Sequence, residues 1–173
     1  MGAYLHIGFV VKATTTLPKN VSKANFQKEV EAYYPSEVFD CVEGEGGSIT
    51  LALKSSIATA ELAPFVQEIY KDWSGRIDKD AMDFIEENIN DPNWLEKVED
   101  ADLYRFYVLD YGVYDYFKIA GEEIGFRLTV VTLASEGKFS MEQSESTLGF
   151  METCAQRAYA QYKMAKAFRV YVL

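Results

Sequence analysis

Hydrophobic and polar residues alternate in three consecutive runs between residues 103 and 133, and glycines at positions 112 and 121 separate the runs. In the last run the even-numbered residues from Ile124 to Val130 are apolar, so this face of the strand is expected to point into the core. The pattern predicts a three-stranded meander with turns at Gly112 and at Gly121–Glu122. Its three runs are residues 103–110, 113–120 and 124–131.

The N-terminal part of the chain is predicted to form a strand, a helix, two strands and a second helix. The first helix can be capped by Asn20 or Ser22, and its buried stripe is expected to contain Phe26, Val30 and Tyr33. This order matches the first five elements of a ferredoxin-like βαββα arrangement, whose next strand would come from the meander. The five elements are expected at residues 4–12, about 20–34, 36–42, 48–54 and 58–73.

A long helix and a short edge strand are predicted at the C-terminus. The helix is expected at residues 144–168 and the strand at residues 169–173. We therefore predict one α+β domain, residues 1–173, with a largely antiparallel sheet and helices packed on it, and with an acidic helical insertion at residues 76–102. The buried stripe of the long helix is predicted to consist of Leu148, Met151, Ala155, Ala158, Tyr162 and Ala165.

Negative charge is concentrated in the predicted insertion. The chain has a formal net charge of −10, and residues 76–102 contain 3 basic and 10 acidic residues, so this segment carries seven of the ten excess negative charges. Binding to nucleic acid or to an anionic membrane requires clustered lysine and arginine, and the charge distribution argues against both.

The sequence also bears on location and assembly. The apolar N-terminal residues lack the basic region of a secretory signal peptide, and no apolar run reaches the length of a membrane span. We therefore expect a cytoplasmic protein. Cys41 and Cys154 lack the spacing of a metal site and are expected to be thiols in a reducing compartment. The terminal edge strand leaves a homo-oligomer possible.

Few residues are candidates for catalysis. His6 is the only histidine, which excludes a histidine-based metal cluster, and a pairing of His6 with Cys41 across neighbouring strands is the one nucleophile-and-base pair to consider. Paired carboxylates at Glu122 and Glu123, or at Asp110 and Asp115, are a further hypothesis. Neither observation is specific, so no catalytic residue, metal or cofactor is assigned.

Of all the features of the sequence, the acidic helix gives the strongest indication of a function. Asp80, Asp83 and Glu87 are three and four residues apart, and like charges at this spacing oppose a helix by about 0.2–0.5 kcal/mol per pair. The face is either a solvated surface or a docking site for a basic protein. We favour a non-enzymatic protein-binding module, by analogy an acidic immunity or inhibitor-type protein. Its expected contact residues are Asp80, Asp83, Glu86, Glu87, Glu96, Glu99 and Asp100, with Tyr104, Tyr114 and Tyr116.

The alternative is a small-molecule-binding domain or an enzyme. It would use an aromatic pocket between the meander and the C-terminal helix, lined by Tyr107, Tyr116, Glu123 and Arg127. A pocket that contains these residues would favour this alternative, and a flat surface in their place would count against it.

Overall fold

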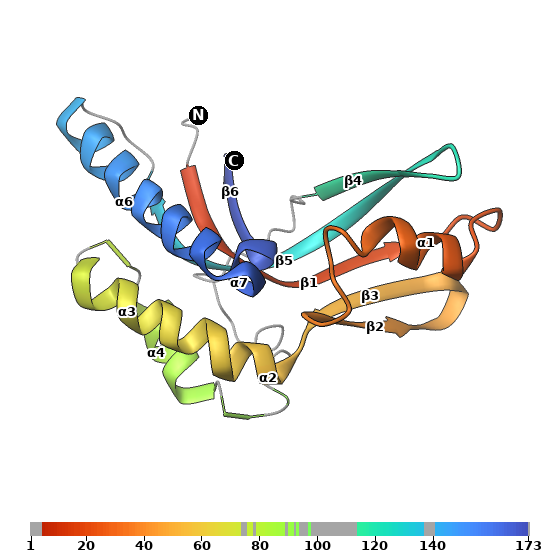
Figure 1. Ribbon diagram of the computed structural model, residues 1–173, viewed down its shortest axis with the longest axis horizontal. Helices are drawn as coiled ribbons and strands as arrows, with labels where there is room; N and C mark the ends of the chain where they lie inside the picture. Colours follow the sequence, from red (N-terminus) through yellow and green to blue (C-terminus); the bar gives the residue numbers. More distant parts are fainter. Residues whose placement is uncertain are drawn as a thin grey trace.

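The computed structural model describes residues 5–73, 76–77, 79–88, 90–91, 93, 97, 114–136 and 141–172. In this part of the chain, an open antiparallel sheet of six strands packs against helices, as the α+β prediction requires (Figure 1). The strands are β1 (Leu5–Thr16), β2 (Phe39–Glu43), β3 (Ser48–Leu53), β4 (Tyr114–Ile119), β5 (Glu122–Glu136) and β6 (Phe168–Val172). The helical segments are α1 (Lys23–Val30), η1 (Glu45–Gly47), α2 (Ser55–Ile57), η2 (Ala58–Leu62), α3 (Ala63–Trp73), α4 (Lys79–Asn88), α6 (Met141–Ala160) and α7 (Tyr162–Ala167).

The strand order is β2-β3-β1-β5-β4, and β6 also pairs with β1. Strand β1 is long enough to have two neighbours on one side, because β6 pairs with Leu5–Phe9 and β3 pairs with Lys12–Thr16. The predicted βαββα order is confirmed, and the strand beside β1 does come from the meander, since it is β5. The predicted C-terminal edge strand is confirmed as β6.

Helices α1 and α3 cover opposite faces of the sheet. The ring of Phe26 on α1 stacks on Phe126 of β5 at 5.6 Å, whereas Phe65 on α3 contacts Phe9 of β1 at 5.2 Å. Phe9 is paired with Val131, which lies five residues from Phe126 in the same strand and therefore on its other face. The predicted core face of β5 is confirmed from Ile124 to Val130, and its other face is also buried at Val131 and Leu133.

Two helix boundaries differ from the sequence prediction. Ser22 caps α1 as expected, but α1 ends at Val30, so the prediction that Tyr33 lies on the buried stripe is wrong. The next turn of the chain exposes 56% of Tyr33 and buries Tyr34, which is only 2% exposed. The second helix begins earlier than predicted, because α2 and the π-helical turn η2 precede α3 and its Pro64.

The C-terminal helix is broken at Gln161 into α6 and α7. The buried residues of α6 include Thr147, Phe150, Cys154 and Ala158, of which Ala158 was predicted. Leu148 and Tyr162, also predicted to be buried, are 60% and 55% exposed. The elements that pack against the helix determine which of its residues are buried, since the ring of Phe150 packs on the ring of Trp73 of α3 with 5.6 Å between their centroids. The contact with α3 therefore decides which face of the helix is buried.

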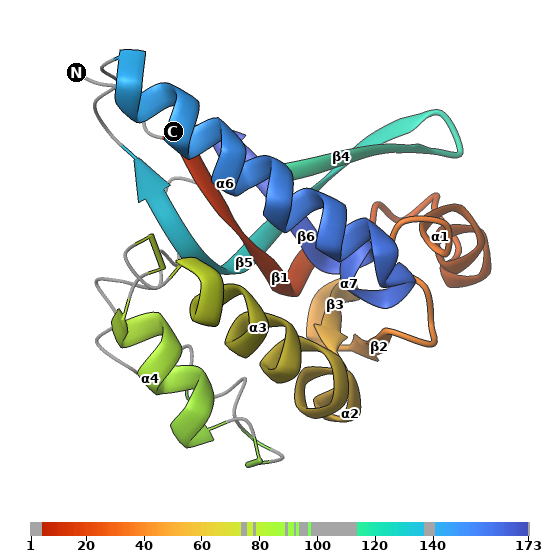
Figure 2. The same cartoon turned by 60° about the vertical axis from the view of Figure 1, so that its left-hand side comes forward.

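The hairpin of β4 and β5 confirms the middle and last runs of the meander, and the first run lies outside the described residues. Its two-residue turn is Ala120–Gly121, one position earlier than predicted, because Ile119 pairs with Glu122. Both turn residues have positive φ, 51° and 85°, which matches the twist of the strands. Both views place this hairpin next to α1 (Figures 1 and 2).

Candidate functional site

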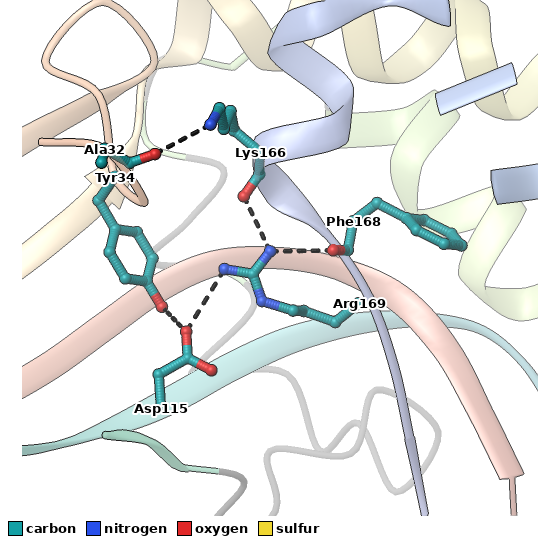
Figure 3. Close-up of polar contacts among 6 residues, drawn as sticks. All are labelled: Ala32, Tyr34, Asp115, Lys166, Phe168 and Arg169. Atoms are coloured by element: carbon teal, nitrogen blue, oxygen red, sulfur yellow. Dashed lines mark hydrogen bonds and ion pairs between the residues drawn. The ribbon is translucent and has the colours of Figure 1, made fainter. Parts of the chain in front are cut away.

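Three segments that are distant in the sequence meet at Tyr34, Asp115 and Arg169, which we call the Tyr34 cluster. Tyr34 follows α1, Asp115 lies in β4 and Arg169 lies in β6 (Figure 3). The Tyr34 hydroxyl donates a hydrogen bond to Oδ2 of Asp115, and Nη2 of Arg169 lies 3.4 Å from the same oxygen. The guanidinium also lies over the Tyr34 ring, with 5.8 Å between its central carbon and the ring centroid.

Strand alternation explains how Arg169 reaches the cluster. Phe168 and Arg169 are consecutive residues of β6, so their side chains leave opposite faces of the sheet. Phe168 packs on Phe9 at 5.6 Å, on the α3 side, and Arg169 points to the α1 side. Nη1 of Arg169 donates to the carbonyl oxygens of Lys166 and Phe168, both at 2.9 Å, so the guanidinium also satisfies carbonyls at the end of α7.

The environment of Tyr34 makes it a hydrogen-bond donor rather than an acid. Burial raises the pKa of the Tyr34 phenol far above its ordinary value, and the negative charge of Asp115 adds to the rise, while Arg169 opposes it. The phenol therefore stays protonated and donates a hydrogen bond to the Asp115 carboxylate. Because the Asp115 and Arg169 side chains are 26% and 23% exposed, the pair is partly shielded from water.

A cleft of about 340 Å³ opens beside the Tyr34 cluster, and we call it the Lys166 cleft. Nζ of Lys166 donates to the carbonyl oxygen of Ala32 at 2.9 Å and lies 5.4 Å from the centre of the Tyr162 ring. The ring of Tyr33 packs on Phe117 at 4.8 Å. The lining residues are Ala32, Tyr33, Asp115, Tyr116, Phe117, Ala165, Lys166 and Arg169.

The acidic residues of α4 lie on its solvent side. Met82 is buried, whereas Asp83, Glu86 and Glu87 are exposed, and none of these three forms an ion pair with another described residue. Asp80 is half-buried and interacts with its surroundings. The predicted amphipathic helix is therefore present at Lys79–Asn88, with a carboxylate-rich outer face.

Of the other predicted contact residues, the structure describes only Tyr114 and Tyr116. Tyr116 is 62% exposed on β4, and Tyr114 is the first residue of that strand. In both cartoon views β4 and α4 lie toward opposite ends of the molecule, so Tyr116 is not brought beside the acidic face (Figure 2). Glu96, Glu99, Asp100 and Tyr104 lie outside the described residues.

The structure separates the two residues of the predicted nucleophile-and-base pair. Cys41 is in register with Leu51, which is paired with Ala13 of β1, and roughly 23 Å of strand separates Ala13 from His6. The His6–Cys41 pairing is therefore wrong. In the part of the chain that the structure describes, there is no group of three or more His, Cys, Asp or Glu side chains that could hold a metal ion.

Of the two predicted carboxylate pairs, the structure tests only Glu122 with Glu123. Glu122 and Glu123 are consecutive in β5 and leave opposite faces, which excludes that pair. Asp110 lies outside the described residues, and Asp115 is engaged by Tyr34 and Arg169.

The predicted aromatic pocket is only partly present. Tyr116 lines the Lys166 cleft, but Glu123 and Arg127 line a different hollow of about 450 Å³ near Thr14, and Tyr107 lies outside the described residues. A cleft does form between β4 and the C-terminal helical segment, with a polar and charged lining that the sequence interpretation did not include.

Sequence reasoning missed Tyr34, Lys166 and Arg169. The local pattern favours Tyr33 over Tyr34 for the buried stripe, and cations such as Lys166 and Arg169 are common near the C-terminus of a helix, where they complement its dipole. The usable signal was Asp115, an acid placed among the apolar residues of its strand face, because such a carboxylate requires a partner.

Comparison of the chain with protein-family models, with curated proteins and with solved structures found no match. Among the described residues, no helix is long and apolar enough to cross a membrane.

Proposed function

We propose that the protein is a cytoplasmic, non-enzymatic protein-binding module whose acidic α4 face docks on a basic surface of another protein. The observation that carries the proposal is the outer face of α4, where Asp83, Glu86 and Glu87 are exposed without ion-pair partners among the described residues. The free thiols Cys41 and Cys154 fit a reducing compartment.

Electrostatic complementarity would increase the rate of association with the partner and the specificity of binding. Three carboxylates on one helix face attract a basic surface over about 10 Å at 0.1 M salt, so association should slow as salt is added. Met82 anchors the other face of α4 in the core, which holds the carboxylates on a fixed element. A partner whose own basic surface binds nucleic acid would be blocked by occlusion, as in the immunity or inhibitor analogy.

A charge-reversal experiment tests this function. Wild-type protein, the triple variant Asp83→Lys, Glu86→Lys, Glu87→Lys, and a control triple variant would be used as baits in host lysate, with captured proteins identified by mass spectrometry. The control reverses Glu29, Glu37 and Glu45, which are also exposed acids and lie outside α4, so both variants have the same net charge.

The expected result is a basic protein retained by wild type and by the control, but lost from the α4 variant and from wild type in high salt. Equal capture by the α4 variant and wild type would contradict the docking proposal, and equal loss from both variants would mean that net charge alone is responsible.

A second candidate function, small-molecule binding, is favoured by one specific observation. The Lys166 cleft lies between β4 and α7, has a volume within the range of about 300–1,000 Å³ typical of ligand sites, and combines aromatic walls with charged side chains. The two functions use different surfaces, since α4 does not line this cleft.

A further inference from the structure

We propose that the Lys166 cleft binds a small aromatic carboxylate, an inference that rests on the ligand-binding function put forward above. The cleft joins the end of α1, one edge of β4 and the α7–β6 junction. Its lining contains two cations, Lys166 and Arg169, and one carboxylate, Asp115, so the lining has an excess of one positive charge in a chain with a net charge of −10.

Lys166 is the group that would bind the anion. Its ammonium has three donor hydrogens, and its contacts in the structure are the neutral carbonyl of Ala32 and the face of the Tyr162 ring. It forms no ion pair with another described residue, in contrast to Lys23, Lys54 and Lys97. A ligand carboxylate could therefore accept a charge-assisted hydrogen bond from Lys166 while the bond to Ala32 remains.

The state of Asp115 explains why the cleft should select anions over cations. Oδ2 of Asp115 accepts from both Tyr34 and Arg169, so its charge is already balanced by the guanidinium beside it. Arg169 is committed in turn to Asp115 and to two backbone carbonyls. These mutual bonds hold the wall of the cleft in place and leave Lys166 as the charge available to a ligand (Figure 3).

The uncharged walls favour a flat, apolar ligand body. Tyr33 and Phe117 form one aromatic wall, and two further lining residues, Ala32 and Ala165, have small apolar side chains. Aromatic side chains stack on planar ligands with offset or edge-to-face geometry. A volume of about 340 Å³ suits a ligand of one or two rings rather than a nucleotide.

Four probes separate the contributions of the ring and the charge. Benzoate, benzamide and benzamidine share one ring and differ in charge, and acetate carries the charge without the ring. Each would be titrated into uniformly ¹⁵N-labelled full-length protein, and backbone amide shifts would locate the binding. We expect benzoate to shift Tyr33, Phe117 and Lys166, with at least about tenfold weaker binding of the other three probes.

Variants on α7 test the role of Lys166. Lys166→Met removes the charge but keeps an apolar stem, and Lys166→Arg keeps the charge. Lys163→Met is the matched control, because Lys163 is on the same helix and does not line the cleft. We expect Lys166→Met to weaken benzoate binding about tenfold, Lys166→Arg to weaken it less than Lys166→Met does, and Lys163→Met to bind like wild type. Thermal midpoints without ligand would verify that each variant is folded.

Three outcomes would overturn the inference. Unchanged benzoate affinity in Lys166→Met would exclude the proposed anion contact. Binding of benzamide or benzamidine in the cleft as tight as that of benzoate would refute the choice of an anion while ligand binding itself stands. If none of the four probes shifts the cleft residues, the second candidate function fails together with the inference.

Discussion

Nη2 of Arg169 lies 3.4 Å from Oδ2 of Asp115, although β1 and β5 separate their strands in the sheet. In a flat sheet their backbones would be roughly 14 Å apart across the strands. They would also be roughly 20 Å apart along the strands, because Asp115 is level with Phe126 of β5 and Arg169 is level with Thr132 of the same strand. The sheet must therefore coil strongly. Register shifts in the β1–β5 pairing at Ile7/Gly8 and Val10/Lys12 supply local twist for this coiling.

Removing the Asp115 carboxylate should destabilise the fold. Asp115→Ala leaves the Tyr34 hydroxyl and the Arg169 guanidinium without their shared acceptor in a partly buried site, and we expect the free energy of unfolding in urea to fall by about 2–3 kcal/mol. Asp40→Ala is the control, because its carboxylate is exposed and 3.8 Å from Lys54, and it should stay within about 0.5 kcal/mol of wild type. Equal effects of the two substitutions would show that the Tyr34 cluster is not a stabilising junction.

Alanine should have opposite effects at two glycines. A Cβ at Gly8 would lie 2.2 Å from the backbone oxygen of Val131, so Gly8→Ala forces β1 and β5 apart, and we expect a loss of about 2–3 kcal/mol. A Cβ at Gly149 meets no atom within 4 Å on α6, so Gly149→Ala should stabilise the protein by about 0.5–1 kcal/mol. Thermal and urea unfolding of both variants check this, and a tolerated Gly8→Ala would mean that the two strands are not so close.

The β4–β5 turn can be improved at Ala120. Its φ of 51° is unfavourable for alanine, and asparagine tolerates this conformation and commonly precedes glycine in such turns. Ala120→Asn should raise the free energy of unfolding by about 0.5–1 kcal/mol, and Ala120→Val should lower it. The measurement is again urea unfolding. A reversed order of the two variants would contradict the turn assignment.

Stability should decrease as the pH falls below about 6.5 because of His6. Burial lowers the pKa of the His6 imidazole, so the folded protein keeps the ring neutral while the unfolded chain takes up a proton near the ordinary value of 6.5. The unfolded state then binds more protons, and the contribution of His6 is complete above 6.5 and lost as the pH falls toward the lowered folded pKa. Urea unfolding at several pH values should show a weaker dependence in His6→Gln, and identical profiles would refute this.

The two thiols should differ in reactivity. Burial raises the pKa of the Cys154 thiol to about 12, with the Arg157 charge opposing the rise, whereas Cys41 is partly exposed on β2. With a disulfide reagent at about pH 8, Cys41 should react at least about a hundredfold faster than Cys154 in the native protein, and both should react in denaturant. Cys41→Ser and Cys154→Ser assign the two rates. Rapid native reaction of Cys154 would show that α6 does not bury it.

The amino-acid sequence by itself determined the elements whose signals are local. The even-numbered face of β5, the Ser22 cap of α1, the amphipathic α4 and the C-terminal strand β6 were all predictable, because periodicity and capping depend on residues a few positions apart. The same local rules failed at Tyr33 and Leu148. Whether each of these residues or its neighbour in the sequence is buried depends on which helix or strand packs against it.

The tertiary structure alone decided the candidate site. Tyr34, Asp115 and Arg169 are 81 and 54 residues apart in sequence, and they meet only because the sheet coils and because β6 directs Phe168 and Arg169 to opposite faces. The same coiling brings the end of α7 to the end of α1, where Lys166 contacts Ala32 and borders the cleft. No local pattern encodes how far a sheet coils, since that depends on the summed twist of paired strands and on the helices packed against them.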